Sequence, residues 1–169
     1  VTGVQTCALP IFSYWIGAQR TDQAVRASRD GFVLVISCAL AVAMVLLVLH
    51  TPIAHAYTRQ ATVALMAAGM ISWLALYVLA DAVQVMCFFL LRCYRVTLSP
   101  LLIYCVMLWG GGLSGGYWIA YRGLGHWEPV QHPVAFWITS SLALVVASVS
   151  MALLLRWTQR AREARVQAD

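Results

Sequence analysis

A single carboxylate lies inside a long apolar stretch of the chain. Asp81 is the only charged residue between Arg59 and Arg92, in a segment that reads QATVALMAAGMISWLALYVLADAVQVMCFFLL. A charge at the centre of a bilayer costs at least about 2.5 kcal/mol, so such residues face a bundle interior or a water-filled cavity. A carboxylate in that position can bind a proton, a sodium ion or an organic cation.

Three polar or aromatic side chains share the helical face of Asp81. They are spaced three or four residues apart, which stacks them on one side of an α-helix: Trp73, Tyr77 and Gln84. Tyr77 and Gln84 can donate a hydrogen bond to the carboxylate or coordinate an ion, and Trp73 offers a π-face to a lipophilic cation. The structural alternative is that Asp81 pairs with an arginine or with backbone groups and only holds helices together, while the rings pack.

This face of the helix predicts a site for cation exchange. The charged form of a carboxylate is disfavoured in a low-dielectric cavity and favoured by a nearby cation. When a proton or a sodium ion neutralises Asp81, an organic cation loses its counter-charge and leaves, which is the physical basis of antiport. We therefore expect a cation- and substrate-binding site at Asp81, Tyr77, Gln84 and Trp73, with H⁺ or Na⁺ as the coupling ion and no cofactor.

The composition indicates a polytopic membrane protein. Of the 169 residues 62% are hydrophobic and 10% are charged, and the mean hydropathy is +0.80. All eleven basic residues are arginines, which together with abundant Ala, Val and Leu is typical of a GC-rich bacterial genome. The net charge of +5 could indicate a nucleic-acid partner, but the arginines flank the apolar stretches, so membrane orientation explains them better.

Four apolar stretches are long enough to cross a bilayer as helices. They cover about residues 31–49, 61–91, 101–121 and 134–155. Because a membrane requires each spanning segment to satisfy its own backbone groups, and because the loops are short, we expect an all-α, antiparallel helical bundle. Pro52 is expected to end the first span and open an outer loop.

The distribution of arginines orients the spans. With the C-terminal tail inside, the outer loops hold only Arg59 and Arg122. The inner segments hold Arg20, Arg26, Arg29, Arg92, Arg95, Arg156, Arg160, Arg162 and Arg165. This bias predicts that residues 13–30 form a cytoplasmic loop with a short interfacial helix, and that residues 159–169 form a cytoplasmic tail on anionic lipid head groups.

The N-terminal segment does not resemble natural protein sequence. Residues 1–11, VTGVQTCALPI, match the translation of a common short-read sequencing adapter, and the chain has no initiator Met. We interpret residues 1–12 as an adapter artefact and exclude them from the fold. The expectation is that the natural chain continues upstream of Ser13.

Several segments resemble the multidrug and toxic compound extrusion (MATE) family, particularly its NorM-like branch. They are WIGAQRTDQAVRASRDG, AHAYT, LYVLADAVQVM, LLRCYR and LIYCVMLWGGGLSGGYWIA. The resemblance covers about residues 13–158 and implies that residues 31–158 are part of the C-terminal lobe, helices nine to twelve, of a twelve-helix transporter. It implies cation-coupled export of drugs or organic cations across the bacterial inner membrane, with an N-terminal lobe of the same chain as partner.

The resemblance carries over at few functional positions. The aspartate of the family's tenth-helix D-A-x-Q pattern maps onto Asp81, and the preceding tyrosine maps onto Tyr77; in NorM-like members this aspartate contributes to cation binding. There are also departures. The family's L-R-G-Y-K-D loop reads LRCYRV, its G-L-P-x-G-Y pattern reads GLSGGY, and glycines expected near the last helix's F-W appear as Ala135 and Thr139.

Two alternatives to cation-coupled export remain open. One is a flippase for lipid-linked saccharides from the same superfamily, which usually needs basic residues in its cavity, whereas the four spans hold none. The other is an inert truncated membrane protein. An enzyme is not expected, because one acid without a base or metal partner is not a reaction centre and no nucleotide-binding loop is present.

Other candidate residues favour structural roles. The five cysteines form no C-x-x-C pair, and the outer-loop trio of His126, Glu128 and His132 fits no zinc motif. The two histidines at the outer boundary, His50 and His55, could serve a proton relay. Glycine pairs spaced four apart in residues 101–121 indicate either close helix packing or a flexible point, and the sequence does not separate these two.

Overall fold

The chain folds into long helices. The structure, a computed structural model, describes residues 13–18, 20–123 and 132–166. Helices α2 (Thr21–Tyr57), α3 (Ala61–Cys93) and α6 (Val134–Val166) are continuous. Between α3 and α6 runs a composite helix, called here the glycine-rich helix, made of α4 (Leu98–Cys105), η1 (Val106–Leu113), α5 (Ser114–Tyr117) and η2 (Trp118–Arg122). The interpretation of residues 1–12, and that of His126 and Glu128, fall outside the described residues.

The predicted all-α fold with four spans is confirmed. Within the described ranges no strand is present, and four helices are long and apolar enough to cross a membrane. These candidate spans are Asp22–Tyr57, Ala61–Cys93, Leu98–Arg122 and Val134–Ala164. The predicted bounds of the second span are almost those of α3, because the arginine at its end and the polar residues before it limit the apolar run.

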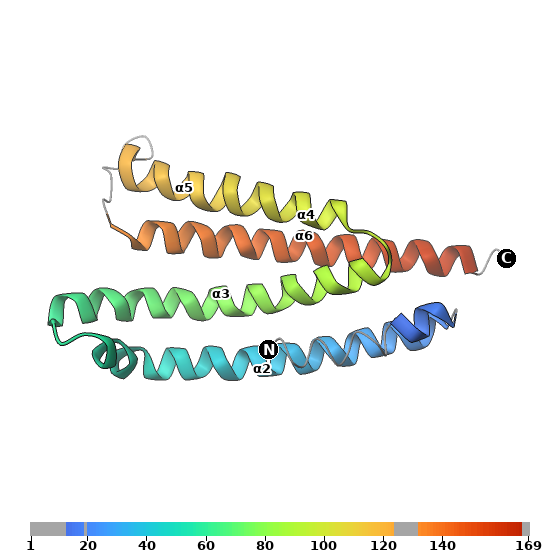
Figure 1. Cartoon of the computed structure of the whole chain (residues 1–169), viewed down its shortest axis with the longest axis horizontal. Coiled ribbons are helices and arrows are strands. Elements are labelled where there is room, and N and C mark those ends of the chain that lie inside the picture. The colour runs from blue at the N-terminus through green and yellow to red at the C-terminus, as the bar shows by residue number, and fades with distance from the viewer. Residues whose placement is uncertain (1–12, 19, 124–131, 167–169) are drawn as a thin grey trace.

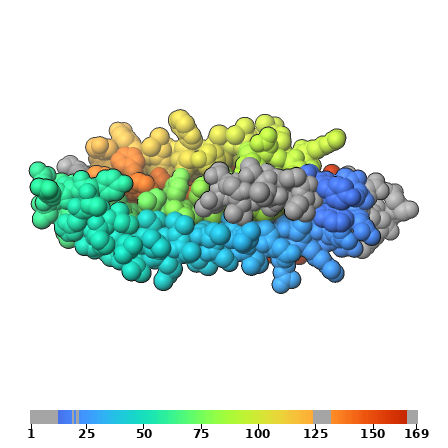
Figure 2. Space-filling model, turned by 60° about the horizontal axis from the view of Figure 1, so that its bottom comes forward, coloured from blue at the N-terminus to red at the C-terminus, as the bar shows by residue number. Residues whose placement is uncertain are grey.

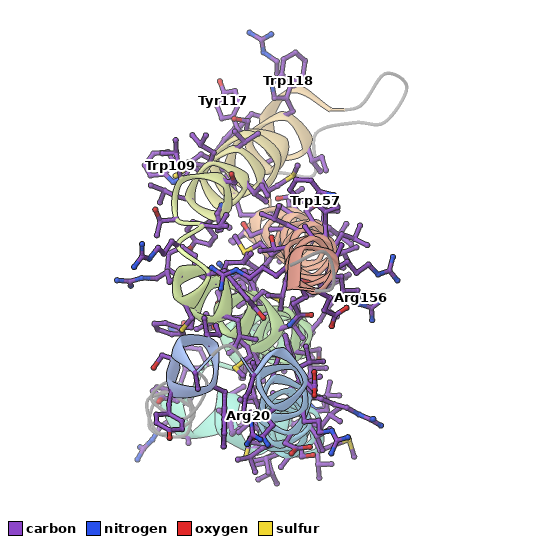
Figure 3. The ribbon with its side chains drawn as sticks, turned by 90° about the vertical axis from the view of Figure 1, so that its right-hand side faces the viewer. Arg20, Trp109, Tyr117, Trp118, Arg156 and Trp157 are labelled. Carbon is purple, nitrogen blue, oxygen red and sulfur yellow. The ribbon has the colours of Figure 1, made fainter. Side chains whose placement is uncertain are left out.

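The helices lie side by side in an order that differs from the order of the chain. Figure 1 shows α2, α3, α6 and the glycine-rich helix in succession, and the end-on view in Figure 3 shows the same succession. α3 packs on α2 and on α6, and α6 packs on the glycine-rich helix. α6 therefore separates two helices that follow one another in sequence. In the space-filling view of Figure 2, α2 forms one long edge and the glycine-rich helix the opposite edge.

The prediction that Pro52 ends the first span is wrong. α2 continues through Pro52 to Tyr57, and its last turns bend away from the axis in Figure 1. Proline removes one intrahelical hydrogen bond and kinks a helix, but neighbouring groups in a membrane protein can satisfy the freed carbonyl. The following residues resume helical bonding, and the amide of Thr58 still donates to the carbonyl oxygen of Ala54 at 3.3 Å.

The two segments that the sequence predicts to be cytoplasmic are more helical than expected. α2 begins at Thr21, ten residues before the predicted span, and α6 continues through most of the predicted tail to Val166. In each case the polar extension still packs against the protein. Ala24 is 1% exposed, and Arg162 lies over the ring of Tyr94 at 5.2 Å from its centroid. Helical structure persists there because one face of each extension contacts the protein, buried at Ala24 and Ser28 in α2 and half-buried at Gln159 and Arg162 in α6.

The hydrophobic core occupies the arginine-rich half of the molecule. It joins α2, the second half of α3 and the second half of α6, and its largest fully buried members include Val35, Leu90, Leu91 and Met151. In the other half of α3 the buried residues are small, Ala64 and Ala75. Small residues let membrane helices approach closely. The bulky packing therefore ends near the middle of α3, where Asp81 lies.

A tight turn at the end of α3 starts the glycine-rich helix. The amide of Arg95 donates to the carbonyl oxygen of Arg92 at 2.9 Å, and that of Val96 donates to Leu91 at 2.9 Å. Arg95 has φ 64°, the left-handed conformation that usually falls to glycine in this type of helix end. The turn places the glycine-rich helix where α6 can pack on it.

Candidate functional site

The site is built on the side of α3 that faces neither α2 nor the core. Residues 74, 77 and 81 follow one another at spacings of three and four, so Leu74, Tyr77 and Asp81 form one stripe along the helix. The neighbouring stripes of α3 are buried, with Ala75 and Ala82 on one side and Ala80 and Gln84 on another. The stripe with Tyr77 and Asp81 is only partly buried and borders open space.

An aromatic cavity lies next to this stripe. It has a volume of about 490 Å³ and lies among α3, η1 and α6. Its lining residues are Leu74, Tyr77, Leu108, Trp109, Leu113, Phe136, Trp137 and Ser140. The rings of Tyr77 and Trp137 meet edge to face, with centroids 6.3 Å apart and planes at 75°. Such a cavity offers π-faces and little polar surface, which suits a flat or lipophilic ligand.

Asp81 lies one helical turn from the cavity wall. Its carboxylate is close enough to Tyr77 for the two groups to interact electrostatically, and Tyr77 interacts in the same way with Tyr104 of α4. Within the described residues no hydrogen bond or ion pair joins Asp81 to another side chain or to the backbone of a neighbouring helix. The carboxylate is therefore partly buried next to Tyr77 and one turn from an aromatic cavity, without a basic partner in the described part of the chain.

Trp73 and Gln84, the other two residues of the predicted site, do not line the cavity. Gln84 is 6% exposed, lies on the buried stripe of α3, and has no hydrogen-bond partner among the described residues. Trp73 is partly buried but is not among the residues that line the cavity. Its backbone carbonyl accepts a hydrogen bond from Ser141 of α6 at 3.4 Å. The structure thus places Tyr77 and Asp81 on the stripe beside the cavity, Trp73 at the contact with α6, and Gln84 on the buried stripe of α3.

Several residues of the cavity were missed from the sequence. Trp109, Phe136 and Trp137 supply its aromatic surface, and Tyr104 is the second phenol near Tyr77. An available signal was the spacing of Phe136 or Trp137 from Ser140, which puts a ring and a hydroxyl on one face of a helix. That signal does not say which helix the face meets, so it could not assign these residues to the Asp81 site.

A second, smaller cavity lies between the bent end of α2 and the start of α3. Its volume is about 400 Å³, and two histidines and two hydroxyl residues line it: His50, His55, Thr51 and Ser72. The Nδ1 atom of His50 lies 2.7 Å from the carbonyl oxygen of Leu47. In the described part of the chain, no three residues of the metal-ligating types come together.

The aromatic anchors of the glycine-rich helix lie outside the cavity. Figure 3 shows Tyr117 and Trp118 projecting from this helix away from the other three. The guanidinium group of Arg122 lies over the ring of Trp118, 5.1 Å from its centroid. Tryptophan, tyrosine and arginine at a helix end are typical of a membrane–water interface. Their position fits a span that ends near Arg122.

Fold and site together define a class of protein: a multi-pass helical membrane protein with an aromatic cavity and an intramembrane carboxylate beside it. The MatE family model matches residues 1–118. The chain belongs to the MatE family, the multidrug and toxic compound extrusion transporters that its segments resemble.

Named relatives agree with this family. The chain is 31% identical over 144 residues to the probable multidrug resistance protein NorM of Aromatoleum aromaticum, covering 85% of this chain and 31% of that protein. It is 34% identical over 147 residues to the multidrug resistance protein MdtK of Edwardsiella ictaluri, covering 87% of this chain and 32% of that protein. The chain thus spans about a third of the length of these relatives.

Proposed function

We propose that this chain forms part of a secondary transporter that exports drugs or other organic cations in exchange for H⁺ or Na⁺. The observation that carries the proposal is the position of Asp81, a carboxylate one turn from the wall of an aromatic cavity and without a basic partner among the described residues. Membership of the MatE family and the names of the relatives support the multidrug substrate range.

The residues suggest how exchange would work. A lipophilic cation in the cavity would contact the rings of Tyr77, Trp109 and Trp137 and would be attracted by the negative charge of Asp81. Binding of the coupling ion at Asp81 would cancel that charge, so the organic cation would lose its electrostatic attraction. In this mechanism the hydroxyl of Tyr77 would donate a hydrogen bond to the carboxylate or contribute an oxygen to a bound ion. Each ion would thus displace the other.

We propose further that the protein lies in the bacterial inner membrane with its C-terminus in the cytoplasm. The arginine-rich ends of α3 and α6 and the start of α2 lie at the same end of the molecule in Figure 1, which fits the positive-inside rule. The partners would be the lipid bilayer, small organic cations and an N-terminal lobe of the same chain. The proposed protein is a transporter and not an enzyme. It would need the coupling ion, H⁺ or Na⁺, and no cofactor.

The test replaces the carboxylate by its neutral isostere. Asp81→Asn, in the whole reading frame that contains this chain, is expected to abolish resistance to a cationic drug in a drug-sensitive bacterial host, because the amide carries no charge for either ion. Asp30→Asn is the matched control, since Asp30 is exposed and lies outside the apolar run of α2. Resistance would be measured as the minimum inhibitory concentration, with the amount of protein in the membrane checked by immunoblot.

The outcome decides the mechanism. Loss of resistance in Asp81→Asn with normal membrane levels, beside full resistance in Asp30→Asn, supports coupled exchange at Asp81. Undiminished resistance in Asp81→Asn contradicts it. If neither the variants nor the wild type confer resistance to any cationic drug, the proposed transport function itself is wrong.

A further inference from the structure

One wall of the aromatic cavity has an unusual helical geometry. The glycine-rich helix is π-helical over η1 (Val106–Leu113) and again over η2 (Trp118–Arg122). π-helices are rare, usually last a single turn and often occur at functional sites. The three cavity residues that this helix contributes, Leu108, Trp109 and Leu113, all belong to η1. The π geometry therefore decides which side chains form that wall.

A hydroxyl from α6 contacts the backbone of this π segment. Thr139 Oγ1 lies 2.8 Å from the carbonyl oxygen of Gly112, and the same hydroxyl lies 2.9 Å from the carbonyl oxygen of Ala135 in its own helix. Within the described residues, the contact with Gly112 is the only hydrogen bond from a side chain of α6 to η1. It links the two helices beside the cavity.

The absence of a side chain at Gly112 makes this contact possible. A methyl group there would lie 3.2 Å from Cα of Ser140, tighter than ordinary contact. By contrast, a methyl group at Gly110 in the same segment would meet nothing within 4 Å. Within η1, the closest approach to α6 therefore falls at the position whose carbonyl receives the Thr139 hydrogen bond.

We infer that Thr139 is a positioning residue that holds η1 in its π register and so sets which ligands the cavity accepts. The inference rests on the proposed function, because it assumes that an organic cation occupies the cavity. Without the hydroxyl, η1 has less to oppose conversion to an α-helix, which removes the extra residue of the π turn. A change of one residue rotates the side chains before it by about 100°. Trp109 then turns away from the cavity and the wall changes its shape.

If the Thr139 hydrogen bond only stabilised the protein, its removal would affect ligand binding in a different way. Loss of simple helix contact would weaken the protein and reduce the binding of every ligand by the same factor. Loss of the π register would change the preference between ligands of different shape, because Trp109 and Leu108 exchange places with their neighbours. The ratio of two affinities separates these cases.

The experiment compares Thr139→Val, which keeps the shape and removes the hydroxyl, with Thr139→Ser, which keeps the hydroxyl. Both are made in the whole purified transporter, and the probes are ethidium, which is flat, and tetraphenylphosphonium, which is bulky. Thr139→Val is expected to change the ratio of their dissociation constants by about threefold or more, the effect of an average interhelical hydrogen bond in a bilayer. Thr139→Ser is expected to restore the wild-type ratio.

A second readout needs no ligand. Leu108→Cys places a thiol in the cavity wall, and its rate of labelling by a maleimide, located by mass spectrometry, reports the rotation of η1. The rate is expected to change about threefold or more when Thr139→Val is added and to stay unchanged when Thr139→Ser is added. This result separates the inference from the proposed function, since it holds whether or not the protein transports cations.

A variant in η1 itself covers the case in which Thr139→Val does not accumulate. Gly110→Ala adds a methyl group in open space and raises the α-helix propensity of a position inside the π segment by about 1 kcal/mol. It is expected to shift the ligand ratio and the labelling rate in the same direction as Thr139→Val. Gly69→Ala in α3, also open around its Cβ position, is the control and is expected to change neither. Equal ratios and equal rates in all these variants would overturn the inference.

Discussion

The contact between the glycine-rich helix and α6 allows a sharp prediction about two adjacent glycines. A methyl group at Gly116 would lie 2.5 Å from Cδ1 of Phe136, about 1 Å inside ordinary contact, and 3.0 Å from Oγ1 of Thr139. A methyl group at Gly115 would lie 3.6 Å from Cγ2 of Thr139, an ordinary contact. Gly116→Ala is therefore expected to destabilise the protein relative to Gly115→Ala.

The magnitude follows from the comparison of the two variants. Both gain the same helix propensity, about 1 kcal/mol, so this term cancels between them. The difference that remains is the overpacking at Phe136, which costs about 1–3 kcal/mol. Each kcal/mol shifts the melting temperature of a domain of 150–250 residues by about 2–4 °C and that of a larger protein by less, so Gly116→Ala in the whole transporter should melt below Gly115→Ala by up to about 12 °C.

The assay is thermal denaturation of the whole transporter in detergent, followed by fluorescence-detected size exclusion. Binding of ethidium is the second measurement. Phe136 lines the aromatic cavity, so a ring displaced by Gly116→Ala should also weaken binding, whereas Gly115→Ala should leave it unchanged. Melting temperatures of the two variants that agree within about 1 °C would refute the packing argument.

Two further predictions concern the turn after α3. Arg95 has φ 64°, so Arg95→Gly should stabilise the protein by about 1 kcal/mol, while Arg95→Ala, which keeps a Cβ atom, should bring no gain in melting temperature. Burial raises the pKa of Tyr94, against the opposing effects of a hydrogen bond with Gln159 and the charge of Arg162. The folded state therefore favours the protonated phenol, so the stability from Tyr94 is complete below about pH 10 and is lost as the pH rises through the raised pKa. Melting temperatures between pH 9 and 11 should fall less in Tyr94→Phe than in the wild type, and equal slopes would contradict this account.

The sequence predicted the membrane class, the four spans and the central carboxylate. These features depend on local composition: an apolar run long enough to cross a bilayer must be a helix there, and a single charge inside it is visible without any structure. The bounds of α3 and the shared helical face of Tyr77 and Asp81 follow from the same local rules. The family, too, is carried by short segments around those residues.

The helix ends were less predictable because they depend on contacts. The kinked continuation of α2 past Pro52 and the extension of α6 to Val166 require neighbours that the local sequence does not name. The π geometry of η1 is another such feature. Its glycines indicated either close packing or a flexible point, and only the structure shows that Gly112 approaches Ser140 and receives the Thr139 hydrogen bond.

The tertiary structure alone decided which faces meet. In a helix of a soluble protein, a stripe of apolar residues marks the face that is buried. A membrane helix is apolar on all sides, so its sequence does not indicate which neighbour each face contacts. That is why Phe136, Trp137 and Tyr104 could not be assigned to the site of Asp81. Their places follow from α6 lying between α3 and the glycine-rich helix, an order set by small residues and glycines that permit close approach.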